Sequence, residues 1–243
     1  MTFRFLGAVL VVLALCSMRP PSQAGQTYSD AEMERIIEHD LQRVHINDKR
    51  VEVTGGMVTL RGAVSSIGDK NEATDVVSKL TEVTRVNNEL RIVWEGRDDE
   101  IAQEVRTRLN GYVHYTVYDW VQVSVRNGAL QLTGRVTRPH KVQEIAVFLS
   151  KVPGVRALEN DVRAVPFTSS DENLRVSVAV ALYRALPDYA TVPAAPLHSV
   201  VENAHVTLEG AVRTEDERRI AERAAQTVPG VSTVDNHLTV LPQ

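Results

Sequence analysis

The feature that most constrains the fold of this chain is an internal repeat. The segments LRGAV, LTGRV and LEGAV occur at residues 60–64, 132–136 and 208–212. Each of their glycines is followed 26 residues later by an asparagine: Gly62 and Asn88, Gly134 and Asn160, Gly210 and Asn236. Repetition with the same internal spacing predicts three copies of one structural unit. We call them copies 1, 2 and 3, with expected bounds at residues 25–96, 97–168 and 169–243.

The pattern around each glycine predicts a β-hairpin. Apolar residues stand four and two positions before the glycine and two positions after it, and this alternation is typical of a half-buried strand. A second alternating segment precedes it. Gly55-Gly56 separates the two segments in copy 1, and Asn127-Gly128 separates them in copy 2. Such dipeptides favour tight hairpins because they accept positive φ.

The rest of each copy has the apolar spacing of helices. Apolar residues 11, 14, 15 and 18 positions after the glycine predict one helix, and a similar pattern precedes each hairpin. A final alternating segment follows the second helix, and a helical crossover makes the strands that it joins parallel. The expected fold is therefore α+β. It consists of three tandem α-β-β-α-β units, each a three-stranded mixed sheet covered by two helices.

The shared residues have a structural interpretation. We expect the repeated glycines to lie where the facing helix or a neighbouring strand comes close, and the repeated asparagines to bond local backbone at the entry to the last strand. The asparagine is the only polar side chain at the same position in all copies, so no acid–base pair or nucleophile with its base is evident. The seven histidines are scattered, and there is one cysteine. We therefore expect no catalysis, metal or cofactor.

The N-terminus has the features of an export signal. Arg4 precedes an apolar run over residues 5–16, which is too short for a comfortable membrane span. Small residues at Ser22 and Ala24 place cleavage after Ala24, so residues 1–24 are a predicted signal peptide. The alternative is lipidation of Cys16 within a loose lipobox. Either route exports the protein, and a periplasmic location is expected. The net charge of −4 argues against a nucleic-acid partner.

The order of elements and the motifs resemble the BON domain family (bacterial OsmY and nodulation). The resemblance rests on the repeated glycine segments and on Val-Pro-Gly-Val followed by asparagine in copies 2 and 3. Copy 1 departs from it, with Thr81-Glu82 in place of Pro-Gly, and copy 3 has four extra residues within 187–196. The resemblance implies an exported envelope protein that attaches to phospholipid membranes, often in osmotic or envelope stress. It implies no enzymatic activity.

One local cluster suggests a binding surface. Four of the twelve aromatic residues lie close together in copy 2: Tyr112, Tyr115, Tyr118 and Trp120. Two or three of them could complete a small core, or they could form an exposed patch in a lipid headgroup layer, where Tyr and Trp are favoured. Copy 2 has a net charge of +2, whereas copies 1 and 3 each have −4. Nearby cations are Arg106, Arg108 and Arg126.

Two functions fit these observations. The leading hypothesis is a non-catalytic envelope protein that binds anionic phospholipid through copy 2, because anionic lipid attracts basic groups. The alternative is a periplasmic scaffold whose repeats dock onto an envelope protein, since β-α units can be joined by pairing at a strand edge. Nothing in the sequence indicates the oligomeric state.

Overall fold

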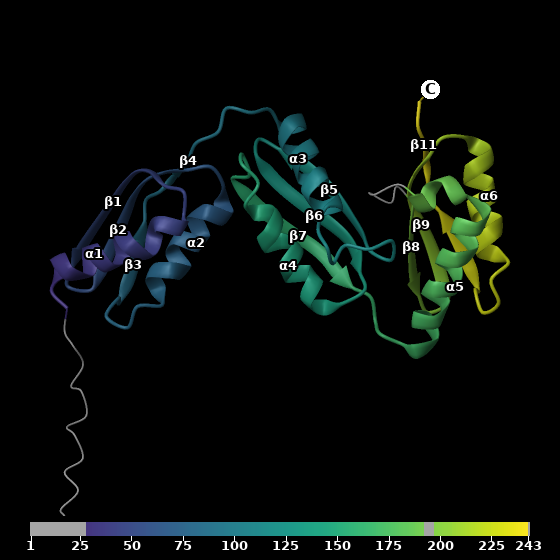
Figure 1. Ribbon diagram of the computed structural model, residues 1–243, viewed down its shortest axis with the longest axis horizontal. Helices are drawn as coiled ribbons and strands as arrows, with labels where there is room; N and C mark the ends of the chain where they lie inside the picture. The colour runs from purple at the N-terminus through teal and green to yellow at the C-terminus, as the bar shows by residue number, and fades with distance from the viewer. Residues whose placement is uncertain (1–27, 192–196, 243) are drawn as a thin grey trace, which may run out of the picture.

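The computed structural model describes residues 28–191 and 197–242 of this chain. The predicted signal peptide, its cleavage site and Cys16 lie outside the described residues. Figure 1 shows three similar units in a row, with copy 2 in the middle. Among the described residues, no helix combines the length and the apolar character that crossing a bilayer requires.

Each copy contains the expected elements in the expected order. Copy 1 comprises α1 (Asp30–Asp40), the short 3-10 helix η1 (Leu41–Arg43), β1 (Asn47–Thr54), β2 (Met57–Val64), α2 (Ile67–Ser78), β3 (Arg85–Asn88) and β4 (Arg91–Ile92). Copy 2 comprises α3 (Asp98–Asn110), β5 (Trp120–Arg126), β6 (Ala129–Val136), α4 (Pro139–Ser150) and β7 (Ala157–Ala164). Copy 3 comprises α5 (Ser169–Ala185), the 3-10 helix η2 (Pro187–Thr191), β8 (Leu197–Glu202), β9 (His205–Val212), α6 (Glu215–Gln226), β10 (Thr233–Asn236) and β11 (Thr239–Val240).

The second strand of each hairpin lies in the middle of its sheet. Strand β6 is antiparallel to β5 and parallel to β7, and β2 and β9 have the same two kinds of neighbour. The predicted α+β units with mixed sheets are confirmed. One detail differs from the expectation. The last strand is continuous in copy 2, but in copies 1 and 3 it is divided into two short pieces that both pair with the middle strand.

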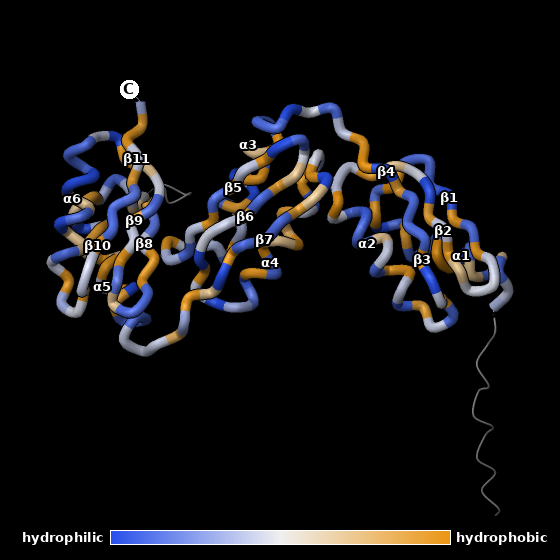
Figure 2. Tube along the Cα trace, turned by 180° about the vertical axis from the view of Figure 1, so that it is seen from behind, coloured by the Kyte–Doolittle hydropathy of each residue, from blue (hydrophilic) through white to orange (hydrophobic). Residues whose placement is uncertain are grey.

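Both helices of a copy cover the same face of its sheet, and each copy has its own core. In copy 1, Ile37 on α1, Leu60 on β2 and Val77 on α2 are fully buried together. The apolar positions of copies 2 and 3 form two further clusters of the same kind. Figure 2 shows how hydrophobic and hydrophilic residues alternate along the strands. The other face of each sheet is not covered by its own helices.

The first helix of each copy also fixes the hairpin turn. The turn residues have positive φ in all three copies, including Asn203 and Ala204 in copy 3. An aspartate in the first turn of the helix accepts hydrogen bonds from the turn amides. These aspartates are Asp30, Asp98 and Asp171. A carboxylate that accepts backbone N–H groups satisfies donors that a tight turn leaves without partners.

Copies 1 and 2 are joined by backbone hydrogen bonds as well as by the linker. The amide of Ile67 donates to the carbonyl of Val155 at 2.7 Å, and the amide of Gly154 donates to the carbonyl of Ser65 at 2.8 Å. The side chain of Ile67 packs against the core of copy 2. Apolar burial and paired amides at this joint indicate a defined contact between the two copies.

Candidate functional site

The repeated glycines lie where the middle strand meets the first strand of the hairpin. Their φ values are +137° at Gly62, +134° at Gly134 and +111° at Gly210. A Cβ atom at Gly134 would overlap the carbonyl oxygen of Trp120, and one at Gly62 would lie 2.6 Å from the carbonyl oxygen of Asn47. The expected close approach of a neighbouring strand is present. The positive φ is a second reason for glycine that the alternating pattern did not reveal.

The repeated asparagines join the last strand to the second helix. In each copy the side-chain amide donates to the helix carbonyl 18 residues earlier, as Asn160 does to Val142 at 3.0 Å. The side-chain oxygen accepts from the backbone amide two residues later, as Asn160 does from Val162 at 3.3 Å. The expected local backbone bond is present, and the bond to the helix is additional. The expected position at the entry to the last strand is wrong: the asparagine is the last residue of β3 and of β10 and the fourth residue of β7. The role of the asparagine is structural in all three copies.

Replacing Asn160 by alanine is expected to destabilise copy 2 by about 1–3 kcal/mol, because two backbone groups lose their partner in a half-buried position. Urea unfolding followed by tryptophan fluorescence would measure this loss. Asn110, which is exposed at the end of α3, provides the control. If Asn110→Ala and Asn160→Ala reduced the free energy of unfolding equally, the structural role of the repeated asparagine would be refuted.

Two aromatic side chains of the cluster have partners within copy 2. The Tyr112 ring stacks on Phe148 at 5.1 Å, and its hydroxyl donates to Glu144 at 2.8 Å. Burial and the neighbouring carboxylate raise the pKa of Tyr112 to about 12, so the hydroxyl stays a donor at neutral pH. Tyr115 packs against the core, and its hydroxyl accepts from the amide of Val121. Both side chains are half-buried.

Trp120 and Tyr115 also face copy 3. Their rings lie 5.1 Å and 5.3 Å from the ring of His198 on β8. The indole nitrogen of Trp120 is buried and has no hydrogen-bond partner in the described part of the chain. Membrane insertion of Trp120 requires this N–H group to stay in water. The structure places it at the joint between two copies.

Polar contacts surround this joint between copies 2 and 3. The amide of Ser199 donates to the carbonyl of Val117 at 2.8 Å, beside the edge of β8. Arg163 on β7 binds Glu202 on β8 through two hydrogen bonds of 2.9 and 2.7 Å. A third contact joins Arg135 to Glu209 at 3.7 Å, and Glu209 is only 8% exposed. The outer face of the third sheet is therefore a contact surface within the chain.

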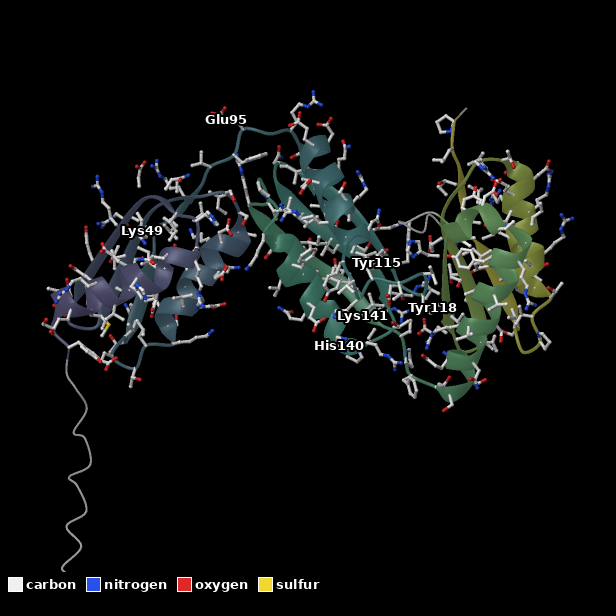
Figure 3. All side chains as sticks on the ribbon, viewed as in Figure 1. Lys49, Glu95, Tyr115, Tyr118, His140 and Lys141 are labelled. Atoms are coloured by element: carbon white, nitrogen blue, oxygen red, sulfur yellow. The ribbon has the colours of Figure 1, made fainter. Side chains whose placement is uncertain are left out.

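Tyr118 has different neighbours from the other three aromatic residues. It lies at the edge of copy 2 that faces copy 3 (Figure 3) and lines a shallow apolar hollow beside α5. We call this surface the α5 patch; its residues are Val117, Tyr118, Val176, Ala179, Val180, Tyr183 and Arg184. Val176 is 53% exposed and Val180 is 43% exposed. Burial raises the pKa of Tyr118 and of Tyr183, so both hydroxyls are neutral at physiological pH.

The repeat pattern does not single out the α5 residues of this patch. Helix α5 has one apolar stripe in the core, which includes Leu174, Val178 and Leu182. It has a second stripe at Val176 and Val180 that faces away from the core. The spacing of these two valines is visible in the sequence, because they are four residues apart. A helix that is apolar on two sides indicates a second contact surface.

The three candidate cations are not gathered around one aromatic group. Arg106 is exposed and lines a cleft of about 380 Å³ with Trp120 and His198. Arg108 is paired with Glu104 on its own helix at 2.7 Å. Arg126 is exposed at the end of β5, next to the hairpin turn. Lipid contact by these three residues stays a prediction. The α5 patch contains a different exposed cation, Arg184.

A buried ion pair in copy 2 was also not predicted. Asp119 is fully buried, and its carboxylate accepts from Lys141 Nζ at 2.7 Å and from the amide of Thr137 at 2.7 Å. Lys141, labelled in Figure 3, is at the start of α4, and its side chain is 8% exposed. Burial alone would raise the pKa of Asp119, but these hydrogen bonds outweigh it and hold the pKa below its ordinary value.

The ion pair of Asp119 and Lys141 has a structural role. Asp119 also accepts from the amide and hydroxyl of Thr116, so its carboxylate fixes the end of the loop that carries Tyr115 and Tyr118. These hydrogen bonds and the pair with Lys141 are sufficient to explain why the charged carboxylate is buried. Within the described ranges, no group of three or more His, Cys, Asp or Glu side chains could hold a metal ion.

Similarity to solved structures is weak. The C-terminal domain of CdsD, a structural protein of the type III secretion system of Chlamydia trachomatis, has 18% identity and a TM-score of 0.25. The match covers 88% of this chain and 100% of that chain. The periplasmic domain of PrgH, a type III secretion inner membrane protein of S. typhimurium, has 14% identity and a TM-score of 0.17, with 80% and 100% covered. Such values carry no information on function.

The comparison with protein families gives a clear match, whereas the comparison with curated proteins gives none. No curated protein matches the chain. The family described as BON domain matches three times, at residues 29–93, 97–166 and 176–242. Each match lies within one structural copy, although the third begins inside α5, and together they contain all three repeated glycines and asparagines. The chain therefore belongs to the BON domain family, of which it contains three tandem copies.

Proposed function

We propose that this chain is a non-catalytic, exported envelope protein that binds anionic phospholipid membranes through the α5 patch, and that it acts in osmotic or envelope stress. BON domains are associated with phospholipid membranes and with osmotic stress, which supports this class of function. The observation that carries the proposal is the exposed apolar stripe of α5, with Val176 and Val180 on its surface. Export to the periplasm rests on the signal-like residues 1–24.

The chemistry of the α5 patch fits the interface of a bilayer. Removing the exposed part of a valine from water contributes on the order of 1 kcal/mol. Tyr118 combines an apolar ring with a hydroxyl, the combination that is favoured at headgroup depth. The hydroxyl of Tyr183 already donates to the carbonyl of Leu197, so this residue contributes only the edge of its ring. Arg184 would contribute about 1 kcal/mol toward an anionic surface. The sum is a reversible attachment of a few kcal/mol, which suits a peripheral protein.

The aromatic cluster takes a smaller part in this proposal than the sequence suggested. Tyr118 lies in the α5 patch, whereas Tyr115 and Trp120 contact His198 and Tyr112 is stacked on Phe148. Trp120→Ala is therefore a test of the joint between copies more than of lipid contact.

Replacing Val180 by aspartate is expected to reduce partitioning onto vesicles of phosphatidylglycerol by about tenfold or more, because a carboxylate must be desolvated at an apolar contact. Co-sedimentation of the chain with these vesicles would measure this partitioning. The control is Val147→Asp, since Val147 on α4 is 49% exposed and lies in another copy.

Three outcomes would contradict this proposal. Equal binding by both aspartate variants and the parent would remove the α5 patch from the lipid contact. Loss in Val147→Asp but not in Val180→Asp would move the contact to α4. If the parent does not bind vesicles at all, the envelope-protein scaffold becomes the better explanation of the fold.

A further inference from the structure

The uncovered face of the sheet in copy 1 differs chemically from its counterparts. Three aligned positions on this face carry Arg50, Arg61 and Arg91 in copy 1. The same positions carry Gln122, Thr133 and Arg163 in copy 2, and His198, Glu209 and Thr239 in copy 3. In copy 3 this face lies against copy 2, and His198 on it is only 5% exposed. Copy 1 has a net charge of −4 and still gathers arginines here.

These arginines line a hollow of about 760 Å³. Its lining residues are Asp48, Lys49, Arg50, Arg61, Gly62, Glu89 and Arg91. Lys49, which Figure 3 labels on copy 1, donates from Nζ to the carbonyl of Glu38. Gly62 contributes no side chain to the centre of the hollow. The volume is within the usual range for small-molecule sites.

One of the three arginines is held by ion pairs, and the other two could bind a ligand. Arg61 is fixed between Glu52 at 2.6 Å and Glu89 at 2.8 Å. Arg50 lies directly opposite Arg61 on the neighbouring strand, where two like charges repel each other. In the described part of the chain, neither Arg50 nor Arg91 has an ion pair, and both are exposed. An anion bound beside Arg50 would offset its repulsion from Arg61, and Arg91 on the other side of β2 could contact the same anion.

We propose that this hollow binds a soluble phosphorylated sugar, with Arg50 and Arg91 on the phosphate and Asp48 on a sugar hydroxyl. Guanidinium groups bind phosphate through paired, charge-assisted hydrogen bonds. A phosphate has enough oxygens to be contacted from two strands at once, whereas a carboxylate has only two. The lining contains no exposed apolar side chain for insertion into a bilayer, so a soluble ligand fits better than a lipid surface.

The test uses the whole chain and glucose 6-phosphate, with glucose and inorganic phosphate as comparison ligands, in isothermal titration calorimetry at low salt. Arg50→Gln with Arg91→Gln is expected to weaken binding of glucose 6-phosphate by about tenfold or more, since charged hydrogen bonds are lost. The matched control is Arg43→Gln with Arg85→Gln. It removes two exposed arginine charges from copy 1 outside the hollow.

The outcomes separate the site from general charge attraction. Binding that is lost only in the first double variant, and that is weaker for glucose and for phosphate alone, supports the proposal. Equal loss in both double variants, or no binding by the parent, would overturn it. Binding of the parent to phosphatidic acid vesicles alone, lost in the first double variant, would also overturn it, in favour of a lipid ligand. None of these variants alters the α5 patch, so the two proposals fail independently.

Discussion

Replacing Asp119 by alanine is expected to lower the free energy of unfolding of copy 2 by about 3–5 kcal/mol, because the buried Lys141 ammonium loses its partner. The amide of Thr137 loses its acceptor as well. Urea unfolding followed by tryptophan fluorescence would report this change. Trp120 belongs to copy 2, and the Trp94 carbonyl accepts a hydrogen bond from Arg156 of that copy.

Asp99 provides a control for this substitution in the same copy. Its carboxylate pairs with Arg97 at 2.5 Å, but both side chains are largely exposed. An exposed pair contributes about 0–1 kcal/mol, so Asp99→Ala should have little effect. A loss in Asp119→Ala no larger than the loss in Asp99→Ala would show that the buried pair does not hold copy 2 together.

The same pair gives the stability of copy 2 a dependence on acid pH. The pKa of Asp119 in the folded protein lies below its ordinary value, in spite of burial, because Lys141 and Thr137 donate to the carboxylate. The contribution of Asp119 is therefore complete above the unfolded pKa of about 3.9 and is lost as pH falls through the lower folded pKa. Asp119→Ala should accordingly have its full effect at neutral pH and a smaller one in strong acid.

Gly134→Ala is the other substitution with a large expected effect. The methyl group would overlap the carbonyl oxygen of Trp120, and the φ of +134° is strained for any residue with a side chain. Backbone strain and overlap each contribute about 1–3 kcal/mol of destabilisation. The midpoint of urea unfolding of copy 2 would fall accordingly.

A second glycine of copy 2 is the matched control. Gly111 ends α3 with a φ of −85°, and an added Cβ would lie 3.5 Å from the nearest carbonyl oxygen, which is an ordinary contact. Gly111→Ala should change the free energy of unfolding by less than about 1 kcal/mol. Similar effects of the two substitutions would refute the requirement for glycine in the middle strand.

Spacing explains which parts of the fold could be predicted from the sequence. The repeated glycine and asparagine are always 26 residues apart, so one offset finds them in all copies. The turn-binding aspartates Asp30, Asp98 and Asp171 precede the glycine by 32, 36 and 39 residues. The segment between the first helix and the hairpin varies in length, which hides these aspartates from a fixed-offset comparison.

The contacts between copies could not be predicted in this way. Trp120 and His198 lie in different copies, and nothing periodic relates them. Alternation places both side chains on the outer faces of their sheets, but it does not indicate that copy 2 contacts the face of copy 3. The α5 patch could not be predicted for the same reason. It forms where copies 2 and 3 meet, with Tyr118 from one copy and Val180 from the next.

The most direct test of the proposed function is flotation of residues 25–243 with liposomes. We expect the protein to float with vesicles that contain phosphatidylglycerol and to stay at the bottom with vesicles of phosphatidylcholine alone. Higher salt should reduce flotation, because the attraction of Arg184 to the anionic surface is screened. A protein that stays at the bottom with both kinds of vesicle at low salt would contradict membrane binding by this chain.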